Sequence, residues 1–143
     1  TMAPVSAKAA GIYIISTLSK HHAQQKGYDD ALMLDYRGFV AECTGANVFL
    51  IKDNEIHTPL ADCFLNGITR QTVIGLANDL GITVHERHIK PEELKEMDEM
   101  FITGSAAELV PVEQVDEKHF QTGPITEKLM QAYMQLVRQP SRE

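Results

Sequence analysis

Two stretches of the chain repeat hydrophobic residues at helical spacing. In the first, the apolar positions follow the i, i+3, i+4, i+7 pattern of one buried helix face: Val73, Leu76, Ala77 and Leu80. The run Leu65 to Arg70 precedes them and Gly81 follows, so the pattern predicts a helix that opens in this run and stops at Gly81. Asn66 and Thr69 are both candidates to cap its start.

The second helical stretch lies near the end of the chain, with Pro124 near its start and Pro140 as its stop. Six apolar residues between them share one face: Ile125, Leu129, Ala132, Tyr133, Leu136 and Val137. Two further helices are predicted at 9–26, by its length, and at 91–97, which is short and acidic. The acidic residues of this short helix are expected to face solvent: Glu92, Glu93 and Glu96.

Short β-rich runs separated by turn signals occupy most of the remaining chain. In the first half, four of these runs predict a meander of antiparallel strands: 31–35, 39–42, 47–52 and 56–58. Later in the chain, three more runs predict strands: 82–89, 100–103 and 109–115. Strands outnumber helices and do not alternate regularly with them, so we predict an α+β fold rather than a doubly wound sheet.

The composition is that of one globular domain. The chain has 143 residues, of which 43% are hydrophobic, and this is enough for a sizeable core. Its formal net charge of -7, without a Lys/Arg run, argues against a nucleic-acid surface. No apolar run approaches the roughly 20 residues that span a bilayer, and nothing resembles a secretory signal. We therefore expect a cytoplasmic protein with neither a nucleic-acid nor a membrane partner.

Residues that commonly bind metals are sparse. Cys43 and Cys63 form no Cys-x-x-Cys pair, which favours reduced thiols over a disulfide framework or a structural zinc site. His85 and His88 lie three residues apart in a predicted strand and so point to opposite faces, and we expect them to face solvent and to bind no metal. The chain also lacks a serine-hydrolase elbow, a dinucleotide-binding glycine motif and a Walker loop.

The start of the helix that follows Leu65 is the feature that by itself indicates a ligand. Up to four backbone N–H groups of a first helical turn lack partners within the helix, and the helix dipole adds about half a positive charge there. Gly67 would let the backbone approach an anion closely. The segment 67–69 is therefore a candidate phosphate site, although an ordinary helix cap is the commoner reason for such a turn.

Four short sequence segments, taken in order along the chain, extend this hypothesis. They are Ala7 to Tyr13 (AKAAGIY), Glu42 to Phe49 (ECTGANVF), Leu65 to Arg70 (LNGITR) and Thr103 to Val112 (TGSAAELVPV). Together they resemble the class IV, fold-type IV aminotransferases that depend on pyridoxal phosphate, and among these the branched-chain amino-acid aminotransferases. The resemblance covers nearly the whole chain and implies the α+β pseudo-barrel of the D-amino-acid-aminotransferase-like fold.

The resemblance assigns two groups that carry the chemistry. Lys8 matches the lysine that bonds to the cofactor as an imine and then moves a proton between the substrate α-carbon and the cofactor, and both tasks need a primary amine. Glu42 matches the carboxylate that pairs with the pyridine nitrogen. At about 4 Å and an effective dielectric near 20, such a pair is worth on the order of 4 kcal/mol before desolvation.

In the family, backbone N–H groups and hydroxyls hold the cofactor phosphate. The matching residues are Gly67, Ile68 and Thr69 and, from a second turn, Ser105. This assignment agrees with the anion site argued from the helix start alone.

Other matched residues lie against the cofactor ring or the substrate. Tyr13 and Leu65 match ring contacts, although both residue types are also common in hydrophobic cores. The turn that receives the substrate carboxylate matches Ser105, Ala106 and Ala107. Their small side chains leave room for a substrate.

The sequence departs from the family pattern at four positions: Ala10, Ile12, Ala46 and Ser105, where glycine, asparagine, glutamate and threonine are usual. None of these departures removes a required chemical group. They bear on substrate preference and cofactor geometry rather than on the reaction class.

The resemblance implies transfer of an amino group between a branched-chain L-amino acid (leucine, isoleucine or valine) and 2-oxoglutarate, in a homodimer. It also implies a small N-terminal domain that supplies an arginine to the cofactor phosphate. Only Thr1 to Ala7 precede Lys8, so we expect residues 1–7 to be an interdomain linker, residues 8–143 to be the C-terminal cofactor-binding domain, and the isolated chain to be inactive or nearly so.

Three other functions stay open from the sequence. A D-amino-acid aminotransferase and an aminodeoxychorismate lyase of the same family share the lysine, the glutamate and the phosphate loop. A non-catalytic domain that binds a phosphorylated ligand, or that serves only in assembly, would use the same helix start without the chemistry.

Overall fold

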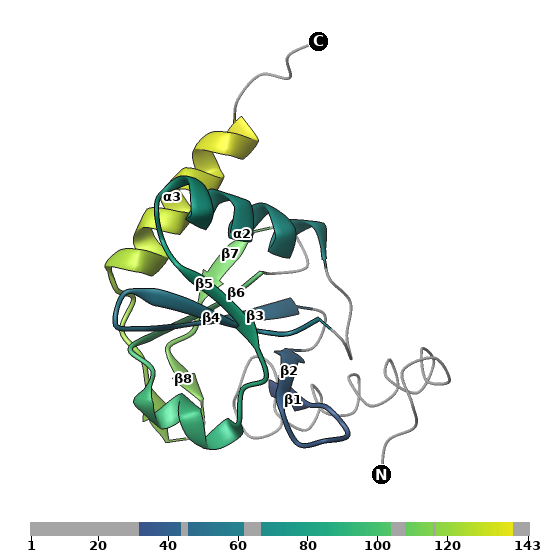
Figure 1. Ribbon diagram of the computed structural model, residues 1–143. Helices are drawn as coiled ribbons and strands as arrows, with labels where there is room; N and C mark the ends of the chain where they lie inside the picture. Colours follow the sequence, from purple (N-terminus) through teal and green to yellow (C-terminus); the bar gives the residue numbers. More distant parts are fainter. Residues whose placement is uncertain (1–31, 44–45, 62–66, 104–107, 116, 139–143) are drawn as a thin grey trace.

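The computed structural model describes residues 32–43, 46–61, 67–103, 108–115 and 117–138 (Figure 1). A seven-stranded sheet forms the centre of this part of the chain: β1 (Leu32–Leu34), β2 (Val40–Cys43), β3 (Ala46–Lys52), β4 (Glu55–Pro59), β5 (Val84–Arg87), β6 (Glu99–Thr103) and β7 (Leu109–Pro111). Two α-helices and one 3-10 helix pack on it: α2 (Ile68–Asp79), α3 (Pro124–Arg138) and η2 (Pro91–Glu96). The strands β8 (Gln114–Val115) and β9 (Lys118–His119) form a separate pair.

Strand β3 is the centre of the sheet because both of its edges are paired. Along one edge it runs antiparallel to β6 over residues 47–51. Along the other edge it pairs first with β2 and then with β4, both antiparallel. Where the pairing passes from β2 to β4, the buried hydroxyl of Thr58 donates a hydrogen bond of 2.7 Å to the Val48 carbonyl. β2 and β4 therefore pair with different parts of the same edge of β3.

Side chains of β3 point alternately to two hydrophobic cores, one on each face of the sheet. Phe49 and Ile51 belong to the core under α2 and α3, and we call this side the helix face. Val48 and Leu50 belong to the core under η2, and we call this side the η2 face. Figure 1 shows the two α-helices on one side of the sheet and the short η2 turn on the other. Because both faces are covered, nearly every residue of β3 is buried.

Helix α2 forms where the apolar spacing predicts it, and Gly81, with a φ of 75°, follows its end. Its first residue is Ile68, and the N-cap is Gly67, which provides no side-chain hydrogen bond. The prediction of Thr69 as a cap was therefore wrong, and the other candidate, Asn66, lies outside the described residues. The buried face also differs from the prediction, since Leu80 is exposed and Arg70 is buried.

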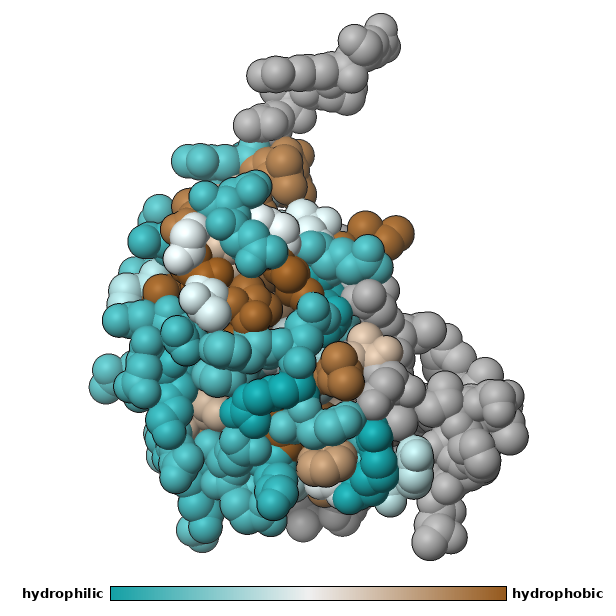
Figure 2. Space-filling model, in the orientation of Figure 1, coloured by the Kyte–Doolittle hydropathy of each residue, from teal (hydrophilic) through white to brown (hydrophobic). Residues whose placement is uncertain are grey.

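Helix α3 begins at Pro124 as predicted, but its hydrophobic face is only partly used. Ile125, Leu129 and Tyr133 are buried against the sheet, whereas Leu136 and Val137 are exposed. The last turns of α3 extend past the sheet edge, as Figure 1 shows, so no strand lies under them. Hydrophobic residues accordingly gather at the surface around the helices in Figure 2, while the lower part of that view is mostly hydrophilic.

Two strand predictions need correction. The predicted strand 82–89 is shorter, Val84–Arg87, and it pairs in parallel with β4. The predicted strand 109–115 divides into β7 and β8, because Val112 N–H bonds to Met100 O and the chain then leaves the main sheet to pair with the unpredicted β9. The four-strand meander itself is confirmed for β1 to β4.

Two helix predictions have different outcomes. The acidic helix at 91–97 is the 3-10 helix η2, with Pro91 at its first position. The helix predicted at 9–26 lies outside the described residues. None of the helices described here has the length and apolar character needed to cross a membrane.

Candidate functional site

Glu42 projects from an interior strand of the sheet. Strand β2 lies between β1 and β3, and Glu42 is the register partner of Met33 on one side and of Asn47 on the other. Alternation along β3 places Asn47 with Phe49 on the helix face, so its partner Glu42 projects there too. No residue in the described ranges makes a hydrogen bond or ion pair with the Glu42 carboxylate. Burial raises the pKa of this carboxyl to about 7.

Asn47 links Glu42 to the neighbouring strand β6. The register partner of Asn47 on that strand is Thr103, and the Asn47 backbone N–H donates to Thr103 Oγ1 at 3.2 Å. Both residues are buried. Three polar side chains on adjacent strands, Glu42, Asn47 and Thr103, therefore lie side by side at one end of the helix face.

The start of α2 reaches the same end of the sheet. A Cβ atom placed on Gly67 would lie 2.9 Å from Asn47 Oδ1, closer than real Cβ atoms approach, so a larger residue here would displace the Asn47 side chain or the turn. The first bond within the helix runs from Gln71 N–H to Gly67 O at 3.1 Å, and the N–H groups of the preceding turn point out of the helix end. Neither a side-chain cap nor an acidic residue occupies this first turn. The helix end is thus suited to an anion.

Arg70 holds α2 in this position, and sequence reasoning missed it. Its side chain is 1% exposed, and its Nη2 donates to Pro59 O at 3.0 Å and to Glu86 Oε1 at 2.9 Å. These bonds join the first turn of α2 to β4 and β5. The hydrophobic pattern could not reveal Arg70 because an arginine at this position is expected in solvent.

The start of α3 is satisfied in a different way. Glu99, buried on β6, accepts a hydrogen bond of 2.8 Å from Thr126 N–H in the first turn of α3. A Cβ atom on Gly123 would overlap the Glu99 side chain, so a larger residue here would displace the carboxylate. The carboxylate therefore caps α3 from a distant strand, which leaves that helix end closed to other anions.

The structure brings together some of the residues predicted for the site. Glu42, Gly67 and Thr69 lie at the same end of the helix face, because Asn47 adjoins both β2 and the start of α2. Ile68 is 84% exposed, so only its backbone N–H can serve an anion there. The other predicted site residues lie outside the described ranges: Lys8, Tyr13, Leu65, Ser105, Ala106 and Ala107. Asn47 and Thr103 lie in two of the four sequence segments that resemble the family, but the sequence analysis assigned them no role.

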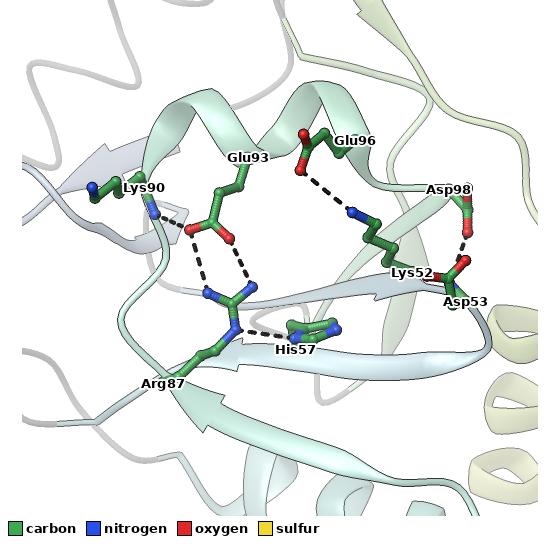
Figure 3. Close-up of polar contacts among 8 residues, drawn as sticks. All are labelled: Lys52, Asp53, His57, Arg87, Lys90, Glu93, Glu96 and Asp98. Atoms are coloured by element: carbon green, nitrogen blue, oxygen red, sulfur yellow. Dashed lines mark hydrogen bonds and ion pairs between the residues drawn. The ribbon is translucent and has the colours of Figure 1, made fainter.

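The η2 face carries a second polar group of residues. His85 Nε2 lies 2.9 Å from Glu55 Oε1, and its ring stacks on that of His57 with centroids 4.7 Å apart. Arg87 donates to His57 Nδ1 at 3.1 Å and to Glu93 at 2.8 Å, as Figure 3 shows. Glu93 is therefore half-buried against Arg87 rather than fully in solvent, and the hydrogen bond from Arg87 lowers the pKa of its carboxyl.

Two further polar residues of this region, His88 and Glu96, have other partners. His88 does not join His85, because its ring stacks on Phe39 with centroids 4.7 Å apart. Glu96 is exposed and lies 3.4 Å from Lys52 Nζ. Spacing along the chain pointed to His85 and His88 as the pair to test. The fold instead places His85 beside His57, its register partner on β4, which lies 28 residues earlier in the chain. No spacing along the chain could have shown this.

The helix-face site has two chemically distinct ends. The half-buried carboxyl of Glu42, with a pKa of about 7, attracts a protonated nitrogen, because a nearby cation favours the ionised carboxylate. The uncapped start of α2 attracts an anion such as a phosphate. A ligand that carries both a basic ring nitrogen and a phosphate would offer the charges that these two ends attract.

Comparison with known proteins identifies the class to which this fold and site belong. The family model for amino-transferase class IV matches residues 3–115, so the chain belongs to that family. This range includes Glu42, Asn47, Thr103 and the start of α2.

The chain is similar to branched-chain aminotransferases. It is 43% identical over 140 residues to a probable branched-chain-amino-acid aminotransferase of Rickettsia felis, an alignment that covers 95% of this chain and 48% of the relative. The branched-chain aminotransferase of Thermoproteus uzoniensis, solved with norvaline, has a TM-score of 0.87 and 44% identity, over 95% of this chain and 46% of that one. These similarities establish the fold as that of the fold-type IV aminotransferases.

A third similar structure was solved with a cofactor. An aminotransferase from Brucella abortus bound to PLP has a TM-score of 0.84 and 39% identity, over 94% of this chain and 48% of that one. The chain thus spans about half the length of the curated relatives it matches.

Proposed function

We propose that this chain supplies the pyridoxal-phosphate site of an aminotransferase that acts on branched-chain L-amino acids, with 2-oxoglutarate as the partner substrate. When bound, pyridoxal phosphate supplies an aldehyde that bonds to amines and a ring that withdraws electrons from the substrate α-carbon. The activity is proposed for the protein that contains this chain, because the relatives that carry the name are about twice as long.

The observation that carries this proposal is Glu42. Burying a carboxyl that no described residue pairs with costs free energy, and the raised pKa is the measure of that cost. A cationic ring nitrogen would repay the cost by holding Glu42 ionised. On one side of it, the bond from Asn47 N–H to Thr103 Oγ1 joins the neighbouring strands β3 and β6.

The start of α2 supports the other end of the cofactor. Backbone N–H groups of Ile68 and Thr69 and the Thr69 hydroxyl are the proposed phosphate donors, and Gly67 permits the close approach of this turn to β3. Arg70 does not reach the phosphate in this proposal, because its guanidinium is buried against Pro59 and Glu86. It acts as a positioning residue for the turn.

Lys8 is the proposed base and covalent anchor, on the strength of the sequence resemblance. A lysine amine can bond to the cofactor, be displaced by the substrate amine, and then carry a proton to or from the α-carbon. Tyr13, Leu65 and Ser105 are proposed to contact the cofactor, and Ser105, Ala106 and Ala107 to receive the substrate carboxylate.

The cofactor assignment is tested by labelling. Pyridoxal phosphate is added to the intact protein that carries this chain, its visible absorption is recorded, and borohydride is used to fix it to the protein. Peptide mass analysis should then locate the label on Lys8, and Lys8→Ala should prevent it, while Lys20→Ala serves as the control. A label on another lysine, or none, would show that the cofactor assignment is wrong.

The substrate assignment is tested by turnover. We expect leucine, isoleucine and valine to be used with 2-oxoglutarate, and D-alanine to be used at least about a hundredfold more slowly, because a site built for one hand misplaces the α-hydrogen of the other. Preference for D-alanine would instead identify a D-amino-acid aminotransferase. Cofactor binding without any turnover would favour a non-catalytic module.

The remaining parts of the proposal concern assembly and location. On the family resemblance we propose a homodimer in the cytoplasm, with residues 1–7 as a linker and 8–143 as the cofactor-binding domain. Light scattering after size-exclusion chromatography of the intact protein gives the mass of the assembly. A monomer that is fully active would contradict this part alone.

A further inference from the structure

The η2 face carries a cluster of potential metal ligands that the proposed function does not use. Glu55 and His57 lie two residues apart on β4, so they project from the same face of the sheet. His85 is the register partner of His57 on the parallel strand β5. We call these three residues the β4–β5 cluster.

The atoms of this cluster that can bind a metal are close together. Glu55 Oε1 lies 2.9 Å from His85 Nε2, and the potential ligand atoms of all three residues lie within 4.8 Å of one another. We propose that the β4–β5 cluster binds one divalent transition-metal ion of the zinc type. The proposal is independent of the aminotransferase function, because Glu42 and the start of α2 lie on the opposite face of the sheet.

The donor set suits zinc. Two imidazoles and one carboxylate, with a fourth position left to water, are ligands that Zn²⁺ takes in proteins. The same nitrogen and oxygen donors suit Co²⁺, Ni²⁺ and Cu²⁺, whereas Mg²⁺ and Ca²⁺ prefer oxygen alone.

Coordination requires only local movement. Two zinc bonds of about 2.0–2.1 Å at a tetrahedral angle place their ligand atoms about 3.3 Å apart. The stacked imidazoles of His57 and His85 must therefore turn about their Cβ–Cγ bonds. The side chains of His85 and Glu55 are 40% and 46% exposed, so they can turn without disturbing the core.

Arg87 bonds to His57 in the metal-free cluster, and it keeps its other bonds when a metal binds. Its Nε–H donates to His57 Nδ1, and a metal at either ring nitrogen ends this bond, either by displacing Arg87 or by moving the ring proton to Nδ1. Arg87 keeps two bonds to Glu93 and one to the His88 carbonyl. Figure 3 shows the Arg87 guanidinium between Glu93 on η2 and His57 on β4.

The charges around the cluster favour a cation. Glu93 balances the positive charge of Arg87, and Lys52 and Glu96 balance each other, which leaves the negative charge of Glu55 for the metal. The net charge of -7 on the chain acts in the same direction.

The test is Zn²⁺ binding by the intact protein, measured by calorimetry after chelation and removal of any affinity tag. We expect one saturable site, and Glu55→Gln, His57→Gln and His85→Gln should each weaken it at least about tenfold. The matched control is His119→Gln, because His119 is exposed on β9 and outside the cluster. No saturable site, or equal affinity in all four variants, would overturn the proposal.

Two further measurements separate metal binding at the β4–β5 cluster from unfolding and from binding by a cysteine. Circular dichroism checks that each variant is folded, and Zn²⁺ should raise the melting temperature of the wild type and of His119→Gln but not of the cluster variants. Co²⁺ should give the weak visible bands of nitrogen and oxygen ligands. The intense near-ultraviolet band of a cobalt–thiolate bond would show that a cysteine binds the ion instead and would overturn the assignment.

Discussion

Glu42 and Glu99 are two carboxylates on the same face of the same sheet, and their surroundings differ. Glu99, the register partner of Ile51, caps the start of α3 and is enclosed by Gly123. Glu42, the register partner of Asn47, has no hydrogen-bonding partner within the ranges that the structure describes, and burial raises the pKa of its carboxyl to about 7. Glu99 serves the fold, and Glu42 is the carboxylate that we propose for the cofactor.

The same contrast applies to the two helices that these carboxylates adjoin. The fold closes the start of α3 with a charge from β6, whereas the start of α2 carries no side-chain cap. A helix start without a side-chain cap and a half-buried carboxyl that no described residue pairs with are both unfavourable in isolation. A ligand that offers a cation to one and an anion to the other would remove both costs together.

The largest expected effect comes from removing the charge of Glu42. In the intact protein, Glu42→Gln should lower kcat/KM for leucine at least about a hundredfold, or about 3 kcal/mol, because the cofactor ring loses its anionic partner. Steady-state kinetics with saturating cofactor measures this. The matched control is Glu93→Gln on the η2 face, which should keep activity within about twofold. Equal losses in both variants would remove the distinction between the two faces.

Glu99 should show the opposite behaviour. Glu99→Gln should lower the free energy of unfolding by about 2 kcal/mol, because the α3 cap loses its charge and a buried amide gains donors without partners. Urea denaturation followed by circular dichroism measures the change. Activity per folded molecule should stay near that of the wild type. If Glu99→Gln is as stable as the wild type, the cap does not hold α3.

The raised pKa of Glu42 predicts a pH-dependent stability in the cofactor-free protein. The folded carboxyl titrates near 7 and the unfolded one near 4.5, so the stability present below pH 4.5 is lost as the pH rises through 7. After allowance for partial exposure, the loss is about 1 to 2 kcal/mol. Urea denaturation at pH 5 and pH 8.5 should show this loss in the wild type and not in Glu42→Gln. A parallel loss in the variant would assign it to other groups.

The smallest effect concerns the glycine at the start of α2. Gly67→Ala places a Cβ against Asn47 Oδ1 and should weaken cofactor binding about tenfold by moving the turn, with about 1 kcal/mol lost in stability. The control is Gly75→Ala in the same helix, where the Cβ meets nothing within 4 Å and should add about 0.5–1 kcal/mol. Fluorescence titration with pyridoxal phosphate compares the two. Normal binding by Gly67→Ala would show that the close approach to β3 is not needed.

Local patterns in the sequence predicted the elements whose formation depends on neighbours along the chain. Apolar spacing at Val73 and Ala77 predicted the buried side of α2, and turn residues predicted the antiparallel meander of β1 to β4. The helix start at Gly67 could be recognised as an anion site because the free N–H groups belong to any helix start. Glu42 was identified because the segment that begins with it resembles a known family.

The tertiary structure decided what depends on partners distant in sequence. It placed Asn47 between Glu42, Thr103 and the start of α2, buried Arg70 against β4 and β5, and assigned Glu99 to α3. It also joined β5 to β4 in parallel and so brought His57 to His85. Hydrophobic periodicity tells which side of an element is buried, but not which other element covers it, because that choice rests on packing and charge across the whole fold.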